Sequence, residues 1–272
     1  MPPRTRSAAA LTARSADRHV LYEASVQDTE ADIHFIQRVY RKAHGRVPLR
    51  LREDFCGTAR LCADWAASHP ERQAIGLDLD QKTMDWGTAR HLAPLGPAAK
   101  RVRLLRRNVL DGLRTKVDVA VAFNFSYCAL RERDTLTTYC AGVRRSLAPG
   151  GAFFLDIHGG TECLEEMEET TRHRGFTYVW DQKAYDAVGG LGVRHIHFRF
   201  PDGTAIEPAF TYDWRLWQLP ELRDVLASAG FARVEVYWEG ADARGHGNGI
   251  FRKVRRAVNE QSWIAYVVAW RD

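Results

Sequence analysis

The sequence predicts an α/β fold: a doubly wound, mostly parallel sheet of seven strands with helices on both faces and an antiparallel β insertion. Residues 49–80 read as strand, turn, helix and strand, which is a βαβ unit. Residues 117–123 are nearly continuously apolar, as a parallel strand covered on both faces must be. Residues 175–213 instead alternate apolar and polar side chains, which indicates antiparallel strands with one buried face.

The first βαβ unit carries the strongest candidate site. A strand at Leu49–Arg52 runs into a turn at 53–58, a helix follows over 59–68, and a second strand at 74–77 ends on Asp78. Asp78 lies 21 residues after Gly57, about where a βαβ nucleotide site places the carboxylate that binds a ribose. Because two vicinal hydroxyls favour one bidentate acceptor, we expect Asp78 to hold a ribose.

The run EDFCGTA, residues 53–59, followed by GLDLD, residues 76–80, resembles motifs I and II of class I S-adenosylmethionine-dependent methyltransferases. Their usual motif I is an acid, a variable residue and Gly-Cys-Gly-Thr-Gly. Glu53 takes the acidic place, while Phe55 and Ala59 replace the first and last glycines. A dinucleotide pyrophosphate needs those glycines so that backbone N–H groups can approach it, whereas the methionine half of the methyl donor carries only a carboxylate and an ammonium. The loss of two glycines therefore argues more strongly against an NAD enzyme than against a methyltransferase.

The resemblance implies S-adenosyl-L-methionine as cofactor and a set of binding residues around these motifs. In the family, the acid after strand 3 accepts from the adenine amino group, and Asn108 takes that place here, with a turn role as the alternative. Asn124 follows strand 4, where a doubly wound sheet places ligand contacts. The expected cofactor-binding residues are Glu53, Phe55, Cys56, Gly57, Thr58, Asp78, Leu79, Asn108, Val109 and Asn124.

Three side chains are candidates for catalysis. His158 follows strand 5 and titrates near the range of a general base, with a structural loop role as the alternative. Tyr127 lies in the loop after strand 4, at the predicted ligand edge. Tyr22 precedes a helix capped by Asp28, in a segment that covers the cofactor in the resembling family, and it could equally only pack there. Methyl transfer is an in-line displacement that alignment alone can accelerate, so a base is optional.

The later part of the chain extends the resemblance to residues 20–272. Leu147-Ala148-Pro149-Gly150-Gly151 before strand 5 recurs across these enzymes, and a helix at 219–230 leads to two closing strands. The insertion at 175–217, expected as three strands, occupies the place where small-molecule methyltransferases often carry a sheet that covers the substrate. An interface in a homodimer is the alternative. The acidic stretch at 165–169 reads as an exposed helix face.

Composition narrows the class of protein. The 272 residues are 45% hydrophobic, with no run of about 18 to 20 apolar residues, so we expect no membrane span. Five irregularly spaced cysteines favour a reducing cytoplasm and no metal site. The net charge of +5 comes mostly from four arginines within residues 1–18, which we expect to form a disordered leader or a transit peptide. No nucleic-acid-binding patch is expected in the remaining domain, residues 19–272.

These observations lead to one functional hypothesis and two alternatives. The resemblance implies a methyltransferase that moves a methyl group from S-adenosylmethionine to O, N or S of a small-molecule acceptor. The alternatives are a methyltransferase acting on protein or RNA, and a non-catalytic S-adenosylmethionine-binding protein, which the replaced glycines at Phe55 and Ala59 make worth testing.

Overall fold

The computed structural model describes residues 11–242 and 247–272, which group into two compact units. The larger unit holds residues 28–163 and 215–272, and the smaller holds residues 11–27 and 164–214 within the described part. Residues 1–10, most of the predicted leader, and 243–246 lie outside the described residues. No helix in the described part is long and apolar enough to span a membrane.

The larger unit is built on an eight-stranded sheet in the order β11-β10-β12-β5-β4-β1-β2-β3. Its strands are β1 (Arg50–Asp54), β2 (Gln73–Asp78), β3 (Val102–Arg106), β4 (Val117–Ala122), β5 (Leu147–Gly159), β10 (Arg233–Ala241), β11 (Gly247–Val254) and β12 (Trp263–Trp270). Strands β1 to β5 pair in parallel, whereas β12, β10 and β11 pair antiparallel. The chain leaves β1 towards β2 and β3 on one side and reaches β4 and β5 on the other, so the order reverses between β1 and β4.

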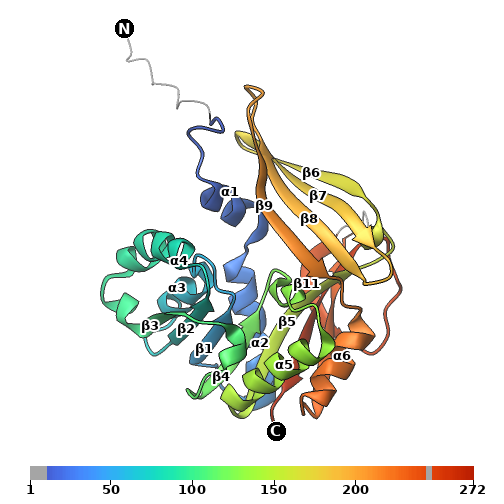
Figure 1. Ribbon diagram of the computed structural model, residues 1–272. Helices are drawn as coiled ribbons and strands as arrows, with labels where there is room; N and C mark the ends of the chain where they lie inside the picture. Colours follow the sequence, from blue (N-terminus) through green and yellow to red (C-terminus); the bar gives the residue numbers. More distant parts are fainter. Residues whose placement is uncertain (1–10, 243–246) are drawn as a thin grey trace. The chain divides into compact units, whose positions relative to one another are not determined.

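Helices cover both faces of this sheet, as predicted (Figure 1). One face packs against α2 (Thr29–His44), α3 (Arg60–Ala67) and α4 (Gln81–Gly87), and the other against α5 (Arg133–Ser146) and α6 (Leu219–Ser228). Short helical turns follow at η1 (Thr88–Leu92), η2 (Ala93–Arg101), η3 (Val109–Asp111), η4 (Ser126–Ala129) and η5 (Glu162–Leu164). Every residue of β4 is buried, which confirms the apolar central strand.

The predicted strand count for this sheet was low by one, because β11 lies between the two predicted closing strands, where no further strand was expected. Most residues of β11 are exposed, and only Phe251 and Val254 are half-buried. An edge strand has one unpaired side and little burial, so its sequence carries a weak period.

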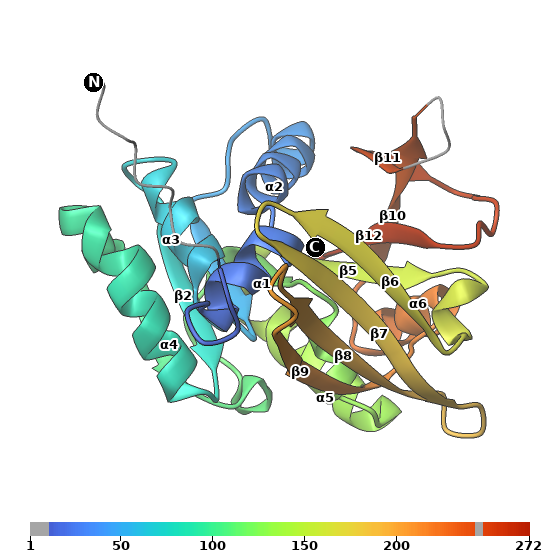
Figure 2. The ribbon, with the colours of Figure 1, turned by 90° about the horizontal axis from the view of Figure 1, so that it is seen from above.

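The smaller unit contains α1 (Arg18–Val26) and a four-stranded antiparallel sheet. Its strands are β6 (Met167–His173), β7 (Phe176–Asp186), β8 (Leu191–Arg199) and β9 (Ala205–Arg215), seen side by side in Figure 2. The sheet therefore has four strands rather than three and begins at Met167, before the predicted insertion. The acidic stretch at 165–169 enters edge strand β6, not a helix, because charged residues suit a solvated sheet edge.

Part of the predicted leader is folded against this small sheet. Leu11, Ala13 and Ala16 pack on its hydrophobic cluster, and the Ala13 N–H donates to Thr204 Oγ1 at 2.9 Å. Asp17 then caps α1 by accepting from the His19 N–H at 2.8 Å. Within residues 11–18 the disordered-leader prediction is therefore corrected, because three apolar side chains find a buried surface.

Candidate active site

The turn after β1 keeps a glycine-like backbone although two expected glycines are absent. Phe55, Gly57 and Ala59 have φ of 56°, 51° and 55°, so all three positions of the family's glycine pattern are left-handed. This conformation costs a residue with a Cβ about 1 to 2 kcal/mol. The turn is held to the neighbouring strand, because the Cys56 N–H donates to the Leu77 carbonyl at 3.0 Å. The sequence departure therefore changes side chains and not the path of the backbone.

Close packing explains where these side chains go. The Phe55 ring lies edge-on to Tyr139 at 5.9 Å, and Ala59 is fully buried. Gly87 touches the turn from α4: a Cβ at Gly87 would lie 1.8 Å from the Thr58 carbonyl oxygen. Gly87 therefore provides the close approach that seats the turn. Phe55 faces the α5 side of the sheet.

Asp78 joins the ends of β1 and β2. Its Oδ2 accepts from the Gly57 N–H at 2.8 Å and its Oδ1 accepts from the Asp80 N–H at 2.9 Å. The side chain is half-buried, and each carboxylate oxygen keeps a lone pair for a further donor. Leu79, next in the chain, is 61% exposed, although an apolar side chain usually seeks burial. The structure thus brings Gly57, Asp78 and Leu79 together at the carboxyl edge of the sheet.

Asn108 takes the turn role that was the alternative to adenine binding. Its Oδ1 accepts from the Leu110 N–H at 3.0 Å at the start of η3. Val109 is buried, and Leu110 remains 36% exposed. A carbonyl oxygen has two lone pairs, so the adenine contact of Asn108 stays a prediction.

Glu53 is buried at the end of β1, where its Oε2 accepts from the Cys62 N–H in the first turn of α3 at 3.1 Å. Burial raises the pKa of Glu53 to about 8, and the carboxylates of Asp32 and Asp78 add to that rise. Burial also raises the pKa of the Cys56 and Cys62 thiols well above the usual range, so neither is a thiolate nucleophile.

Asp156 shapes the loop after β4. Its two carboxylate oxygens accept from the Asn124 N–H at 2.7 Å and the Phe125 N–H at 3.0 Å. Asn124 and Phe125 are both left-handed, so their successive N–H groups form a concave anion site that Asp156 fills. Burial raises the pKa of Asp156 to about 7. Because both its oxygens accept backbone N–H groups, Asp156 acts as a structural acceptor that fixes this loop.

Asp32 and Tyr266 were not anticipated as site residues. The Tyr266 hydroxyl donates to Asp32 Oδ1 at 2.6 Å, and Tyr266 is the cross-strand neighbour of Asp156. Burial raises the pKa of Asp32 to about 6. In sequence, Asp32 reads as a first-turn acid that complements the α2 dipole, and only its spacing to Phe35 and Ile36, three and four residues on, signals that it faces inward.

Two predicted catalytic residues line one cavity: Tyr127 lies in η4 after β4, and His158 lies within β5, which extends to Gly159, rather than after the strand as predicted. The His158 and Phe125 rings are 4.5 Å apart, and His158 is half-buried. Tyr127 has no exposed surface, and burial raises its pKa well above the usual value, so the phenol stays protonated. Both line a cavity of only about 10 Å³, the size of one water. A catalytic role for Tyr127 would require this loop to open, and the roles of both residues stay predictions.

Tyr22 belongs to the smaller unit. It lies on α1 with its ring 5.1 Å from Phe210, among residues that pack on the hydrophobic cluster of the small sheet. This is the packing role that the sequence left open. The other candidates belong to the larger unit, and the substrate contact of Tyr22 stays a prediction.

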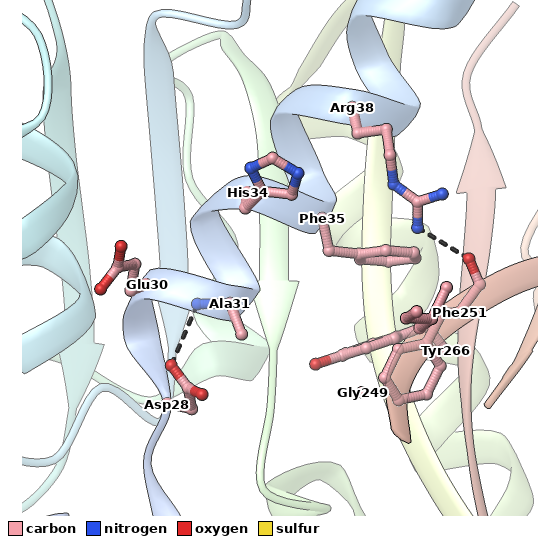
Figure 3. A pocket seen from close by; sticks show the side chains of 10 residues that line it. Asp28, Glu30, Ala31, His34, Phe35, Arg38, Gly249, Phe251 and Tyr266 are labelled. Carbon is pink, nitrogen blue, oxygen red and sulfur yellow. Dashed lines mark hydrogen bonds between the residues drawn. The ribbon is translucent and has the colours of Figure 1, made fainter. Parts of the chain in front are cut away.

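A cavity of about 520 Å³ opens beside α2 in the larger unit. Asp28 and Glu30 lie at the start of the helix, His34 follows, and the Phe35 ring stacks on Tyr266 at 4.3 Å (Figure 3). Asp28 Oδ1 accepts from the Ala31 N–H, so this carboxylate also caps α2. The cavity is thus aromatic at its inner wall and acidic at one end. Through Tyr266 it borders the Asp32 and Asp156 carboxyls.

The sheet order, the turn and the position of Asp78 define a class I methyltransferase fold, and comparison with solved structures supports this assignment. The chain is similar to an S-adenosylmethionine-dependent methyltransferase from Clostridium acetobutylicum, with 16% identity, a TM-score of 0.66, and coverage of 93% of this chain and 96% of the other. It is also similar to CalS10, an amino pentose methyltransferase from Micromonospora echinaspora, with 16% identity, a TM-score of 0.62 and coverage of 93% and 96%.

A third similar structure is the sugar N-methyltransferase KedS8 from Streptoalloteichus, with 16% identity, a TM-score of 0.61, and coverage of 100% of this chain and 98% of the other. No protein-family model and no curated protein matches the chain. At these identities the similarity establishes the fold.

Proposed function

We propose that this protein is an S-adenosylmethionine-dependent methyltransferase that acts on a small molecule. One observation carries the proposal: a left-handed turn after β1 is hydrogen-bonded to a half-exposed carboxylate at the end of β2, through the Gly57 N–H and Asp78. The site lies beside the point where strand order reverses, which is where open α/β sheets bind ligands.

The residues present fit the methyl donor. Asp78 has lone pairs for the ribose hydroxyls, exposed Leu79 offers an apolar surface for the adenine, and Glu53 lies at the start of α3 near the turn. When bound, S-adenosylmethionine supplies an electrophilic methyl group on a sulfonium. The protein contributes alignment and exclusion of water, which can supply much of the acceleration of an in-line displacement. Asn124, held by Asp156, lies at the same edge of the sheet.

The donor site is tested by titration calorimetry with S-adenosylmethionine and its demethylated product. In Asp78→Ala we expect affinity to fall by about ten- to 150-fold, because a charge-assisted bidentate acceptor contributes roughly 1.5 to 3 kcal/mol. The matched control is Asp85→Ala, an exposed carboxylate on α4. Unchanged affinity in Asp78→Ala would refute the ribose assignment. Competition by NAD or NADP at micromolar affinity would refute the choice of cofactor.

For the acceptor, the cavity beside α2 favours a cationic amine. Asp28 and Glu30 give one end negative charge, and the Phe35 and Tyr266 rings offer a surface for cation–π contact or for an apolar ring. Arg38 is the cation of the lining, and its guanidinium donates to the Phe251 carbonyl at 2.7 Å. An amine must lose a proton before methylation, and Asp32, whose pKa burial raises to about 6, is suited to receive one. Amino sugars, the substrates named for CalS10, are the first acceptors to test.

The charge of the cavity is tested with Asp28→Asn combined with Glu30→Gln, which keeps the shape and the helix cap. For amino-sugar acceptors we expect KM to rise about tenfold while donor affinity is unchanged, since the loss is electrostatic. The corresponding hydroxyl sugars serve as the neutral comparison and should show no change. An equal effect on both series would exclude recognition of the amine. Donor binding without turnover across the panel would instead indicate a non-catalytic binding protein.

A further inference from the structure

We propose that Asp181, His195 and His197 of the small sheet form a binding site for a divalent transition metal of the zinc type. This inference lies wholly within the smaller unit and is independent of the methyl-transfer proposal. The sequence predicted no metal site, because its cysteines are irregularly spaced and the His195-Ile196-His197 run was not recognised as metal-ligand spacing.

Strand geometry brings the three side chains together. Asp181 on β7 is directly opposite His195 on β8, and His197 lies two residues further along β8. Side chains alternate between the faces of a strand, so His195 and His197 share one face, while Ile196 between them packs into the hydrophobic cluster on the other. Directly opposite residues in an antiparallel pair point to the same face, which adds Asp181 to the two imidazoles.

The distances match a tetrahedral site. Asp181 Oδ2 lies 3.1 Å from His197 Nε2 and 3.5 Å from His195 Nδ1, and all three ligand atoms lie within 4.8 Å of one another. Metal–ligand bonds of about 2.1 Å at tetrahedral angles place neighbouring ligand atoms about 3.4 Å apart. His195, with a side chain 20% exposed, has the most room to close the remaining separation. Two imidazoles and one carboxylate are a donor set that suits zinc and its neighbours in the transition series.

Burial and charge support binding of a cation. The side chains of Asp181 and His197 are only 13% and 8% exposed, so the contact is sheltered from bulk water. Arg199, a cation on this face two residues beyond His197, is neutralised, since it pairs with Glu168 at 3.0 Å and with Glu207 at 2.5 Å. Asp181 therefore leaves the site with one negative charge when both imidazoles are neutral, which favours a divalent ion over a neutral ligand.

The full chain, freed of metal with a chelator, is titrated with Zn²⁺ and separately with Co²⁺. We expect one equivalent of Zn²⁺ to bind and Co²⁺ to give the intense visible bands of a four-coordinate ion. Zn²⁺ should also raise Tm, since it binds the folded state. Uptake of less than one equivalent, or only the pale spectrum of six-coordinate cobalt, would overturn the proposal even if every variant failed to fold.

Variants locate the site. Mutation of a residue that only hydrogen-bonds to a metal ligand typically weakens metal binding by about 10- to 100-fold. His195→Ala and Asp181→Asn remove a ligand itself, so they should weaken Zn²⁺ binding by more than this and should abolish the Zn²⁺-dependent rise in Tm. Asp181→Asn keeps a side chain that can accept from both imidazoles, so the sheet should remain folded. His34→Gln, an exposed histidine on α2, is the matched control and should bind as the wild type does. Equal affinity in Asp181→Asn and His34→Gln would show that these residues form only an Asp–His hydrogen-bonded cluster.

Discussion

Single residues show that the backbone conformation of the turn after β1 does not require glycine at each left-handed position. Phe55 and Ala59 adopt φ near 55°, as Gly57 does. Ring contact with Tyr139 and complete burial of Ala59 offset the cost of about 1 to 2 kcal/mol per position. The turn therefore keeps the left-handed backbone of the glycine pattern at two positions where the residue is not glycine.

Glu53 makes stability depend on pH with a defined sign. Its pKa is about 8 in the folded chain, against an ordinary value of 4.5, so the folded protein retains a proton that the unfolded chain releases. The contribution of Glu53 to the free energy of unfolding is therefore fully present below about pH 4.5 and is lost as pH rises to about 8. The raised pKa values of Asp156 and Asp32 act in the same direction.

Glu53→Gln should remove the contribution of Glu53 while keeping an oxygen for the Cys62 N–H. At pH 8 we expect the variant to be more stable than the wild type by a few kcal/mol, since one pKa unit corresponds to about 1.4 kcal/mol. At pH 4.5 the two should be nearly equal. Urea unfolding at both pH values measures the difference, with exposed Glu71→Gln as control. A variant that is less stable than wild type at pH 8 would contradict the assignment.

Among the elements, β1 is tied to α5 by a buried polar network. Arg52 Nε donates to Asp54 Oδ1 at 2.7 Å, and both side chains are fully buried. The Tyr139 hydroxyl donates to Asp54 Oδ2 at 2.8 Å, and Arg52 Nη1 donates to Ser146 Oγ at 3.0 Å. The network fixes the strand from which the turn and Glu53 emerge.

Asp54→Ala should lower the free energy of unfolding by about 3 to 5 kcal/mol, because it leaves the buried Arg52 charge without its partner. The control is Asp111→Ala, whose partner Arg107 lies 3.8 Å away on the surface, with both side chains about half exposed. That loss should stay within about 1 kcal/mol. Chemical denaturation of both variants at pH 7 gives the comparison, and similar losses would mean that the buried pair contributes little.

For the whole molecule, the division into two units separates the candidate donor site from the small sheet. All the predicted cofactor-binding residues lie in the larger unit, whereas Tyr22 and Trp180 lie in the smaller. We propose that the small sheet sets acceptor choice, as the resemblance suggested, with an interface between copies of the chain as the competing role.

Trp180→Ala distinguishes these roles. Trp180 lies 6.1 Å from Trp214 within the aromatic cluster of the small sheet. If this sheet selects the acceptor, turnover should fall severalfold while donor affinity and solution mass stay constant. Val188→Ala, at a fully exposed position in the turn between β7 and β8, is the control. A change in mass with turnover per protomer preserved would favour the interface.

Local signals in the sequence are sufficient to predict most of the helices and strands and their order. The turn after the first strand, the apolar run of β4 and the cap Asp28 are local signals, and each is found in the structure, although β1 extends two residues further than predicted, to Asp54. These features could be predicted because backbone dihedrals, caps and periodicity depend on neighbours in the chain. The same signals fail at edge strands such as β6 and β11, where burial is too slight to impose a period.

Which distant side chains meet, and how much water they lose, depends on how the elements pack in three dimensions. The Tyr139–Asp54 bond, the Asp156 carboxylate under Asn124 and the Asp32–Tyr266 bond each join residues whose sequence context gives no sign of a partner. The pKa of each buried carboxyl follows from that desolvation. The His195–His197 pair shows the same limit, because its spacing is visible in the sequence while the opposing Asp181 is supplied by strand register. Register depends on packing between strands, and no local pattern encodes it.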